Sequence, residues 1–301
     1  ETWNQAVSEE KNIVVTADFT ADLQLQISKP ITVNGNGKTI TAGSWNDPNS
    51  GSKGDASLVL VNNVSDSIVL ENITLAGAKT IDSTASGGQK DYGHGLNIYE
   101  SGNVTLKNVI LRDNAGAGMV VNSSAVNAEG LHTSGNAWAG VNIDKNSGES
   151  APGASLTFDA SSVFEEAVAI YSDNGGVTVT YPAGWAGVNT ESGKVIWIKA
   201  FAGGTGTEAD PYEIETPSQL YNVGLFSEAN NHYKLLNDID MTSTETSQED
   251  KYGDSGDIYQ LYGELDGNGY KIISHKETAG TILYAKNALI KNVTFDVKEH
   301  P

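Results

Sequence analysis

A short motif that recurs at nearly constant spacing constrains the fold of this chain more than any other feature. Each copy is a small residue followed by an apolar, a variable, an apolar and a polar residue, and the copies start 23, 22 and 27 residues apart. A second set of alternating apolar runs is interleaved with them. The first set occupies residues 95–99, 118–122, 140–144 and 167–171, and the second occupies 68–75, 104–111 and 126–133. These internal repeats must be explained before any single residue is interpreted.

The alternation within each run predicts a short β-strand whose apolar residues point inward. Asn72 and Asn108 interrupt two runs at the same position, which predicts corners in the left-handed backbone conformation. A period of about 22 residues with several short strands is typical of one coil of a parallel β-solenoid. Leucine-rich repeats share this period, but they need a leucine consensus and one helix per repeat, and neither occurs. The sequence therefore predicts an all-β solenoid.

The chain contains two openings of the same kind, each a short helix followed by strands and a glycine-rich turn. The helices are expected at 3–7 and 217–223, and the turns are Asn34–Gly37 and Asp266–Gly269. Such turns suggest a calcium loop, but an EF-hand needs glycine at its sixth position, where Thr39 and Lys271 stand. Turn chemistry between strands therefore explains both copies, and no metal site is predicted.

The glycine-rich segment 202–207 divides the two openings. We therefore expect a parallel β-helix over residues 1–200 and a second, truncated β-helical unit over residues 201–301. Longer gaps between repeats predict loops that leave the solenoid. These loops are expected at 42–56, 77–93 and 145–153.

The charge of the chain excludes several classes of function. It has 38 acidic residues against 18 lysines and arginines, a formal net charge of −20, and Arg112 is its single arginine. Nucleic acids and anionic lipids both require a basic surface. No stretch approaches the roughly 20 apolar residues of a membrane span, and cysteine is absent. We expect no nucleic-acid partner, no membrane insertion and no cofactor.

The composition, rich in glycine and acidic residues and free of cysteine, favours an extracellular protein, secreted or displayed on a bacterial cell surface. The chain starts at Glu1 without an initiator methionine, and it ends directly after a strand-like run. We therefore expect it to be part of a longer polypeptide.

The coil repeats of residues 1–200, together with Asn34–Gly37, resemble the pectin-lyase-like superfamily of right-handed parallel β-helices. This resemblance implies right-handed coils with short capping helices. The segment from Gly203 onward, with Asp210–Ile214 and Asp266–Gly269, resembles a recurrent opening module of β-helices in large bacterial surface proteins. The superfamily contains lyases, glycoside hydrolases, adhesins and autotransporter stalks, so the resemblance implies a fold more than an activity.

His94 and Arg112 are the catalytic candidates that the resemblance suggests. Gly93-His94-Gly95 resembles the histidine motif of polygalacturonases, which also use three aspartates, two of them adjacent and upstream of the histidine. No adjacent pair precedes His94, which favours a structural or ligand-contact role. Arg112 resembles the catalytic arginine of pectate lyases, but no acidic calcium-binding cluster can be assembled around it. A salt bridge to Asp113 or a solvated turn is the favoured interpretation.

The alternation also predicts an outward surface. If the apolar residues of 96–98, 119–121, 141–143 and 168–170 point inward, their neighbours form two columns, Asn97-Val120-Asn142-Ala169 and Tyr99-Asn122-Asp144-Tyr171. Amide and carboxylate groups beside tyrosine rings, repeated about every 4.8 Å, suit the hydroxyls of a neutral sugar. An ordinary solvated strip is the alternative. The predicted glycan-binding residues are Asn97, Tyr99, Asn122, Trp138, Asn142, Asp144 and Tyr171.

Together these features favour a non-catalytic module of a bacterial secreted or cell-surface protein, either adhesin-like or a glycan-binding scaffold. Its expected partner is a polysaccharide or a host or cell-surface glycan. The alternative is a polysaccharide-degrading enzyme, a glycoside hydrolase or a polysaccharide lyase, that uses His94, Arg112 and Asp113. The missing pair of carboxylates and the single arginine favour the non-catalytic interpretation.

Overall fold

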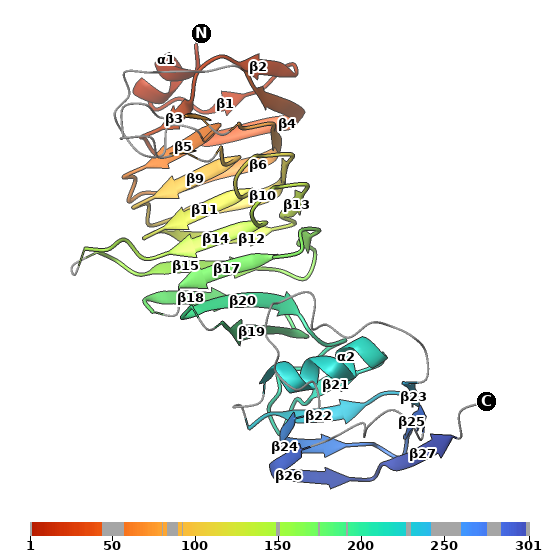
Figure 1. Ribbon diagram of the computed structural model, residues 1–301. Coiled ribbons are helices and arrows are strands. Elements are labelled where there is room, and N and C mark those ends of the chain that lie inside the picture. Colours follow the sequence, from red (N-terminus) through yellow and green to blue (C-terminus); the bar gives the residue numbers. More distant parts are fainter. Residues whose placement is uncertain are drawn as a thin grey trace. The chain divides into compact units, whose positions relative to one another are not determined.

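The computed structural model describes residues 2–43, 57–79, 81–82, 90–91, 93–148, 151–173, 175–190, 192–226, 230–241, 260–275 and 284–298. The chain divides into two compact units. The first is Glu1–Pro182 with Glu191–Trp197, and the second is Ala183–Thr190 with Ile198–Pro301. Short strands dominate both units (Figure 1).

The first unit consists of coils that contribute strands alternately to two sheets. Sheet A runs in the order β1 (Ile13–Val14), β4 (Thr32–Ala42), β6 (Ile68–Ala76), β10 (Val104–Arg112), β12 (Ala125–Glu129), β15 (Ala154–Phe158) and β18 (Val177–Thr180). β2 (Phe19–Ala21), β13 (His132–Ser134) and β16 (Val163–Phe164) pair beside this path. Sheet B runs in the order β3 (Leu25–Ile27), β5 (Val59–Asn62), β9 (Leu96–Tyr99), β11 (Met119–Asn122), β14 (Val141–Asp144), β17 (Ile170–Asp173) and β20 (Lys194–Lys199).

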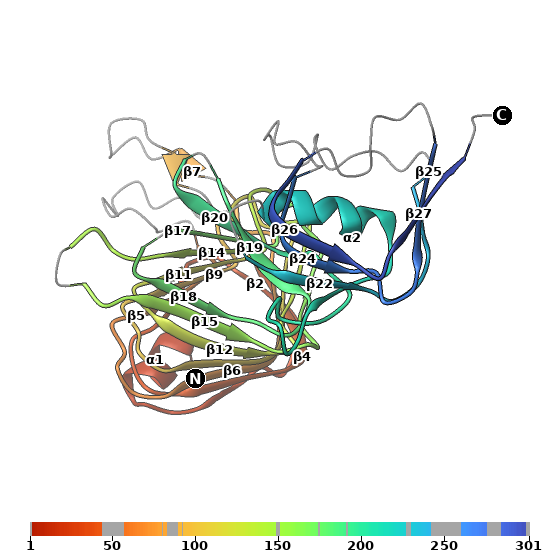
Figure 2. The ribbon, with the colours of Figure 1, turned by 90° about the horizontal axis from the view of Figure 1, so that it is seen from below.

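The strand pairs of sheet A, and those of sheet B from β3 to β17, are parallel. The first unit is therefore a right-handed parallel β-helix, with the hand that crossovers between parallel strands almost always adopt. Figure 2 shows its two sheets as separate layers. β20 differs from the other strands, because it runs antiparallel to β17.

Side chains that point inward from sheet B stack into continuous apolar rows. Each of them is fully buried: Leu96, Ile98, Met119, Val121, Val141 and Ile143. Burying such a side chain contributes about 1.5–3 kcal/mol relative to leaving it in water. The prediction that successive coils superimpose their apolar residues is confirmed for these three strands.

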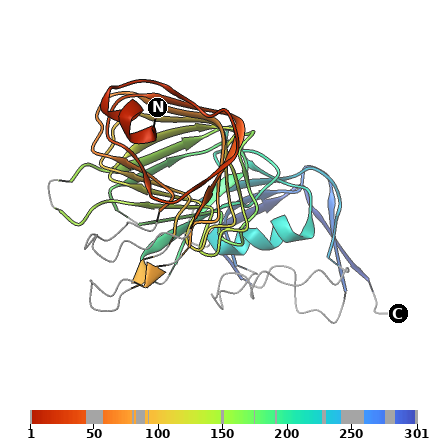
Figure 3. The same ribbon diagram turned by 90° about the horizontal axis from the view of Figure 1, so that it is seen from above.

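The corners and the cap of the first coil follow from local chemistry. Asn72 and Asn108 have φ values of 52° and 51°, as predicted, and Asn108 Nδ2 donates to Asn72 Oδ1 at 3.2 Å. Helix α1 (Trp3–Ser8) begins after Thr2, whose side chain forms a capping box with Gln5. The helix buries Ala6 and Val7 and lies across the end of the coil in Figure 3.

The fourth copy of the sheet B motif is displaced by two residues from its predicted position. Val141 pairs with Ile170, and Asn142 pairs with Tyr171. Val168, predicted to point inward, precedes β17 and is half-buried. Period-2 alternation is unchanged by a shift of two residues, so the pattern at 167–171 did not determine the register. Tyr171 therefore belongs to the column of Asn97 and not to that of Tyr99.

The predicted insertions lie partly outside the described residues. This applies to 44–56, to residues 80, 83–89 and 92 of the second insertion, and to 149–150 of the third. Within the second insertion, β7 (Ile81–Asp82) and β8 (Lys90–Asp91) pair antiparallel. This segment therefore leaves the parallel ladder, as expected of a loop.

The second unit repeats the opening of the first. Its strands are β19 (Trp185–Asn189), β21 (Tyr212–Ile214), β22 (His232–Leu235), β23 (Ile239–Asp240), β24 (Gln260–Asp266), β25 (Lys271–His275), β26 (Tyr284–Lys291) and β27 (Thr294–Lys298). The orders β21-β22-β24-β26 and β23-β25-β27 are both parallel. Helix α2 (Pro217–Asn222) begins with a capping box between Thr216 and Gln219, and a 3₁₀ turn (Val223–Phe226) follows it.

The two glycine-rich turns are structural equivalents. Asn36 and Asn268 have φ values of 51° and 52°. The backbone N–H of Asn36 donates to Asn34 Oδ1 at 2.7 Å, and that of Asn268 donates to Asp266 Oδ1 at 2.8 Å. These contacts form the same turn twice, which agrees with the interpretation of both motifs as turns.

Candidate functional site

Two columns of side chains project outward from sheet B, and we call them the outer face. The first column places Asn97, Val120, Asn142 and Tyr171 opposite one another on β9, β11, β14 and β17. The second column places Tyr99, Asn122 and Asp144 opposite one another on β9, β11 and β14. The outer face is therefore a surface across four neighbouring strands, which Figure 1 shows stacked.

Three aromatic rings form a row beside these columns. The ring centroids of His94 and Trp138 lie 5.9 Å apart, and those of Trp138 and Tyr171 lie 6.4 Å apart. Trp138 is 46% exposed, which is unusual for so large an apolar side chain. Lys194 Nζ lies 6.0 Å from the centroid of the Tyr171 ring and forms an ion pair with Asp173. The row therefore combines ring faces with one cation that already has a counter-ion.

Three amide oxygens of the outer face are buried without a hydrogen-bond partner among the described residues. They are the Oδ1 atoms of Asn97, Asn122 and Asn142. A buried acceptor without a partner costs about 1–3 kcal/mol. Native proteins commonly satisfy such atoms with ordered water or with a ligand. These three atoms are therefore the clearest sign that the outer face has hydrogen-bonding capacity left over.

Asp144 lies half-buried in the second column. Burial raises the pKa of its carboxyl group, against the opposing effects of Asn142 and Lys194. Asn142 Nδ2 donates to Asp144 Oδ2 at 2.5 Å. Asp173 follows Tyr171 by two residues as Asp144 follows Asn142, so the two carboxyl groups belong to the same column on neighbouring strands. The sequence search for adjacent aspartates missed this pair because its members are 29 residues apart.

The loop after β14 contacts the outer face at its β9 end. Asn146 Nδ2 donates to the Tyr99 hydroxyl oxygen and to Glu100 Oε1, both at 2.9 Å. The pKa of Tyr99 is raised, first by its hydrogen bond with Glu100 and then by desolvation. The hydroxyl group of Tyr99 is thus already hydrogen-bonded within the protein, whereas Tyr171 belongs to the aromatic row.

His94 is held by the backbone of the next coil. The N–H of Ala117 donates to His94 Nδ1 at 2.9 Å. Burial lowers the pKa of His94 to about 4, so the ring is neutral near pH 7. A Cβ at Gly116 would lie 2.5 Å from His94 Nδ1, so only glycine allows the ring this close. Gly116 therefore has a structural reason to be glycine.

Arg112 and Asp113 lie at the end of β10 in sheet A. Arg112 Nη1 and Asp113 Oδ2 are 2.5 Å apart, and both side chains are exposed. The predicted salt bridge is confirmed. Both residues lie at a strand end of sheet A, and among the described residues neither forms a hydrogen bond or an ion pair with the columns of the outer face.

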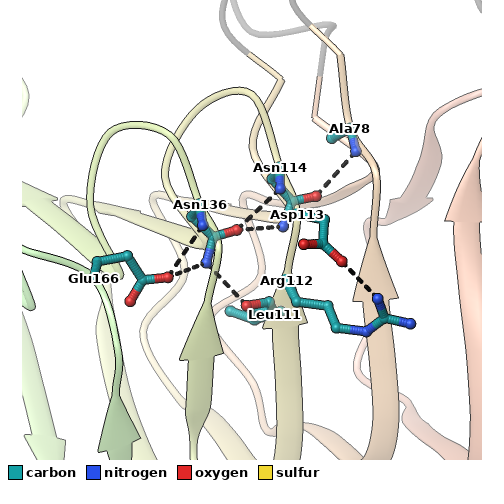
Figure 4. Close-up of polar contacts among 7 residues, drawn as sticks. All are labelled: Ala78, Leu111, Arg112, Asp113, Asn114, Asn136 and Glu166. Carbon is teal, nitrogen blue, oxygen red and sulfur yellow. Dashed lines mark hydrogen bonds and ion pairs between the residues drawn. The ribbon is translucent and has the colours of Figure 1, made fainter.

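A polar ladder at the coil corners was not predicted from the sequence (Figure 4). Asn136 Oδ1 accepts from Asn114 Nδ2 at 2.8 Å, and Asn136 Nδ2 donates to Glu166 Oε1 at 2.6 Å and to Leu111 O at 2.9 Å. Asn114 Oδ1 accepts from the N–H of Ala78 at 3.0 Å. The 22-residue spacing of the two asparagines was the available signal. The ladder ties neighbouring coils together and is structural.

The described residues contain no group of three or more His, Cys, Asp or Glu side chains arranged to hold a metal ion. Within the same residues, no helix has both the length and the apolar character that crossing a membrane requires.

No family model matches the chain. It is 32% identical over 102 residues to a "Putative Gly-rich membrane protein" of Evansella cellulosilytica, a match that covers 31% of this chain and 12% of that protein. Two solved structures align with nearly the whole chain. The Agl-KA catalytic domain has a TM-score of 0.32 and 10% sequence identity, and the alignment covers 98% of this chain and 64% of that one. The catalytic domain of GH87 alpha-1,3-glucanase in complex with nigerose has a TM-score of 0.26 and 8% identity, and the alignment covers 99% of this chain and 64% of that one. TM-scores and sequence identities this low give no evidence about the activity of this chain.

The structure thus brings together most of the residues predicted for the outer face. Asn142 contacts Asp144, and Trp138 contacts Tyr171. His94 joins them through Trp138, although it was predicted as a separate candidate. Sequence reasoning missed Asn146, Asp173 and Lys194, because each depends on a loop conformation or on the register of β17.

Proposed function

We propose that the outer face binds a neutral polysaccharide, and that the chain is a non-catalytic, adhesin-like module of a bacterial secreted or cell-surface protein. The observation that carries this proposal is the set of three partnerless amide oxygens beside the aromatic row. Sugars offer hydroxyl donors for such oxygens and C–H faces for aromatic rings. A few convergent polar groups among aromatic side chains are characteristic of ligand sites.

The charges on this surface favour a neutral ligand over a uronate. Asp144 and Asp173 belong to the outer face, and the chain has a formal net charge of −20. Lys194, the cation beside Tyr171, is paired with Asp173 and so offers little attraction to a carboxylate. A polyanion such as pectate would be repelled.

The repeated openings support the view that the chain is modular. The capping box of Thr2 with Gln5 recurs as that of Thr216 with Gln219, and the turn at Asn36 recurs at Asn268. We propose that the second unit is an opening module of a further β-helix of the kind found in large bacterial surface proteins.

Titration calorimetry with soluble neutral glucans, xylans and mannans, and with pectate as the anionic control, tests the proposal. Tyr171→Ala should weaken binding of a neutral polysaccharide by about 10-fold, since loss of one stacked ring removes about 1.4 kcal/mol. Tyr270→Ala changes a half-buried tyrosine of the second unit and should leave the affinity unchanged. Absence of binding to every neutral polysaccharide would refute the proposal.

Glycoside hydrolysis is the second candidate, and the pair Asp144 and Asp173 favours it. Such enzymes need one carboxyl group with a raised pKa as acid and a second carboxylate as base or nucleophile. Burial raises the pKa of Asp144, while Asp173 forms an ion pair with Lys194. Release of reducing ends from a neutral polysaccharide, abolished in both Asp144→Asn and Asp173→Asn, would establish hydrolysis in place of simple binding.

A further inference from the structure

His94 presents one defined hydrogen-bonding group at the end of the aromatic row. Its Nδ1 accepts the N–H of Ala117 at 2.9 Å. An imidazole nitrogen that accepts a hydrogen bond carries no proton, so the proton of the neutral ring resides on Nε2. Nδ1 and Nε2 lie on opposite sides of the ring, and the Nε2–H is therefore directed away from the backbone of Ala117.

The surroundings fix this arrangement. The backbone of Gly116 lies against this side of the ring, since an added Cβ there would lie 2.5 Å from Nδ1. Burial keeps the imidazole neutral above pH 5. Among the described residues, none accepts a hydrogen bond from Nε2. The protein thus holds the Nε2–H of His94 in one orientation, and no described residue accepts a hydrogen bond from it.

His94 lies close to the ring on which a sugar would stack. The centroid of the His94 ring lies 5.9 Å from that of Trp138, the most exposed ring of the row. A sugar stacked on Trp138 would bring its peripheral oxygens to the edge of that ring. His94 is one of the two rings next to Trp138, and Tyr171 is the other.

We infer that His94 Nε2–H donates a hydrogen bond to an oxygen of the carbohydrate bound on the outer face, and so helps to set which sugar the end of the row accepts. This inference rests on the proposed carbohydrate-binding function. It assigns His94 to ligand contact and gives it no role in proton transfer. The acceptor is a hydroxyl, ring or glycosidic oxygen, because these are the acceptors that a neutral sugar offers.

A pair of substitutions separates the two nitrogens of His94. In His94→Asn, the side-chain oxygen replaces Nδ1 and still accepts from Ala117, but the donor at Nε2 is lost. In His94→Gln, the side-chain amide places a donor near the position of Nε2. We expect His94→Asn to weaken binding of the best neutral polysaccharide by about 10-fold, the effect of one hydrogen bond, and His94→Gln to stay within about threefold of the unsubstituted protein.

Calorimetry and thermal unfolding of both variants complete the test. If His94→Asn binds normally and His94→Gln does not, the side chain acts only through Ala117 and the inference is wrong. If Trp138→Ala loses binding while both His94 variants retain it, the carbohydrate-binding proposal stands and the inference fails alone. If the unsubstituted protein binds no neutral polysaccharide, both fall together.

Discussion

The same residue type, asparagine, has opposite roles in two regions of the first unit. At the coil corners, Asn114 and Asn136 form a ladder in which each side-chain oxygen accepts a hydrogen bond. On the outer face, the oxygens of Asn97, Asn122 and Asn142 have no partner among the described residues. The contrast indicates that satisfied amides hold the coils together, whereas the amides of the outer face keep acceptors that no described residue uses.

The backbone explains why the two regions differ. At a corner the chain turns, so backbone groups such as the Leu111 carbonyl and the Ala78 N–H are free to meet a side chain. Within sheet B, backbone groups are consumed by pairing with the neighbouring strands. Outward side chains there meet one another, as Asn142 and Asp144 do, or a loop residue, as Tyr99 meets Asn146.

Removing the centre of the ladder should have the largest effect. Asn136→Ala removes the acceptor of the Asn114 N–H and Nδ2 and the donor to the Leu111 carbonyl. Glu166 loses one donor but keeps the Thr133 hydroxyl and the backbone N–H at position 136. We expect the free energy of unfolding to fall by about 3–4 kcal/mol, because several buried polar groups lose their partners. Denaturant unfolding measures this. A loss below about 1 kcal/mol would show that the ladder is not structural.

The pH dependence of stability should reveal His94, a member of the aromatic row. Its pKa is lowered from 6.5 to about 4 on folding, so the unfolded chain binds more protons between these values. The contribution of His94 to the free energy of unfolding is therefore fully present above pH 6.5 and is lost as the pH falls toward 4. We expect His94 to account for a loss of about 2–3 kcal/mol between pH 7 and pH 4.5. His94→Asn should lack this part of the slope, and equal slopes would contradict the assignment.

Substitution on the outer face should lower the affinity for polysaccharide and leave the stability largely intact, the opposite of what is expected for the ladder. Asn122→Ala removes a buried oxygen that has no partner among the described residues, so the free energy of unfolding should not fall by more than about 1 kcal/mol. Affinity for a neutral polysaccharide should nevertheless fall several-fold. Comparing unfolding and calorimetry for Asn122→Ala and Asn136→Ala tests the contrast directly. A large stability loss in Asn122→Ala would remove the distinction.

The smallest effect is expected at Arg112. Its ion pair with Asp113 is exposed on both sides, and such pairs contribute little to stability. Arg112→Ala should change the free energy of unfolding by less than about 0.5 kcal/mol and leave polysaccharide binding unchanged. If polysaccharide turnover exists and disappears in Arg112→Ala, this arginine is catalytic and our assignment of it is incorrect.

The sequence predicted the coils well because three independent signals agreed. Period, alternation and left-handed asparagines such as Asn72 and Asn108 all indicated the same solenoid. It failed at Tyr171, because alternation with a period of two residues cannot detect a shift of two. Only the pairing with β14 resolves that ambiguity, and pairing depends on distant parts of the chain.

The sequence predicted which residues of the candidate site point outward from sheet B, but it did not predict which side chains contact one another. Asn97 and Asn142 follow from counting residues outward from the core. The row that joins His94 to Trp138 does not, because both residues lie in turns whose path the repeat does not determine. The pair of Asp144 and Asp173 was missed for the related reason that it depends on the corrected register.

The reversed direction of β20 gives the first unit a built-in stop. A further parallel rung needs the slanted hydrogen-bond pattern of a parallel neighbour, and an antiparallel strand on β17 does not continue it. The usable length of the outer face is therefore set by how many rungs precede this reversal. Duplicating the 22 residues from Gly118 to Ala139 should extend that length by one rung while both ends stay as they are, so this architecture can be tuned to longer chains by whole-coil increments.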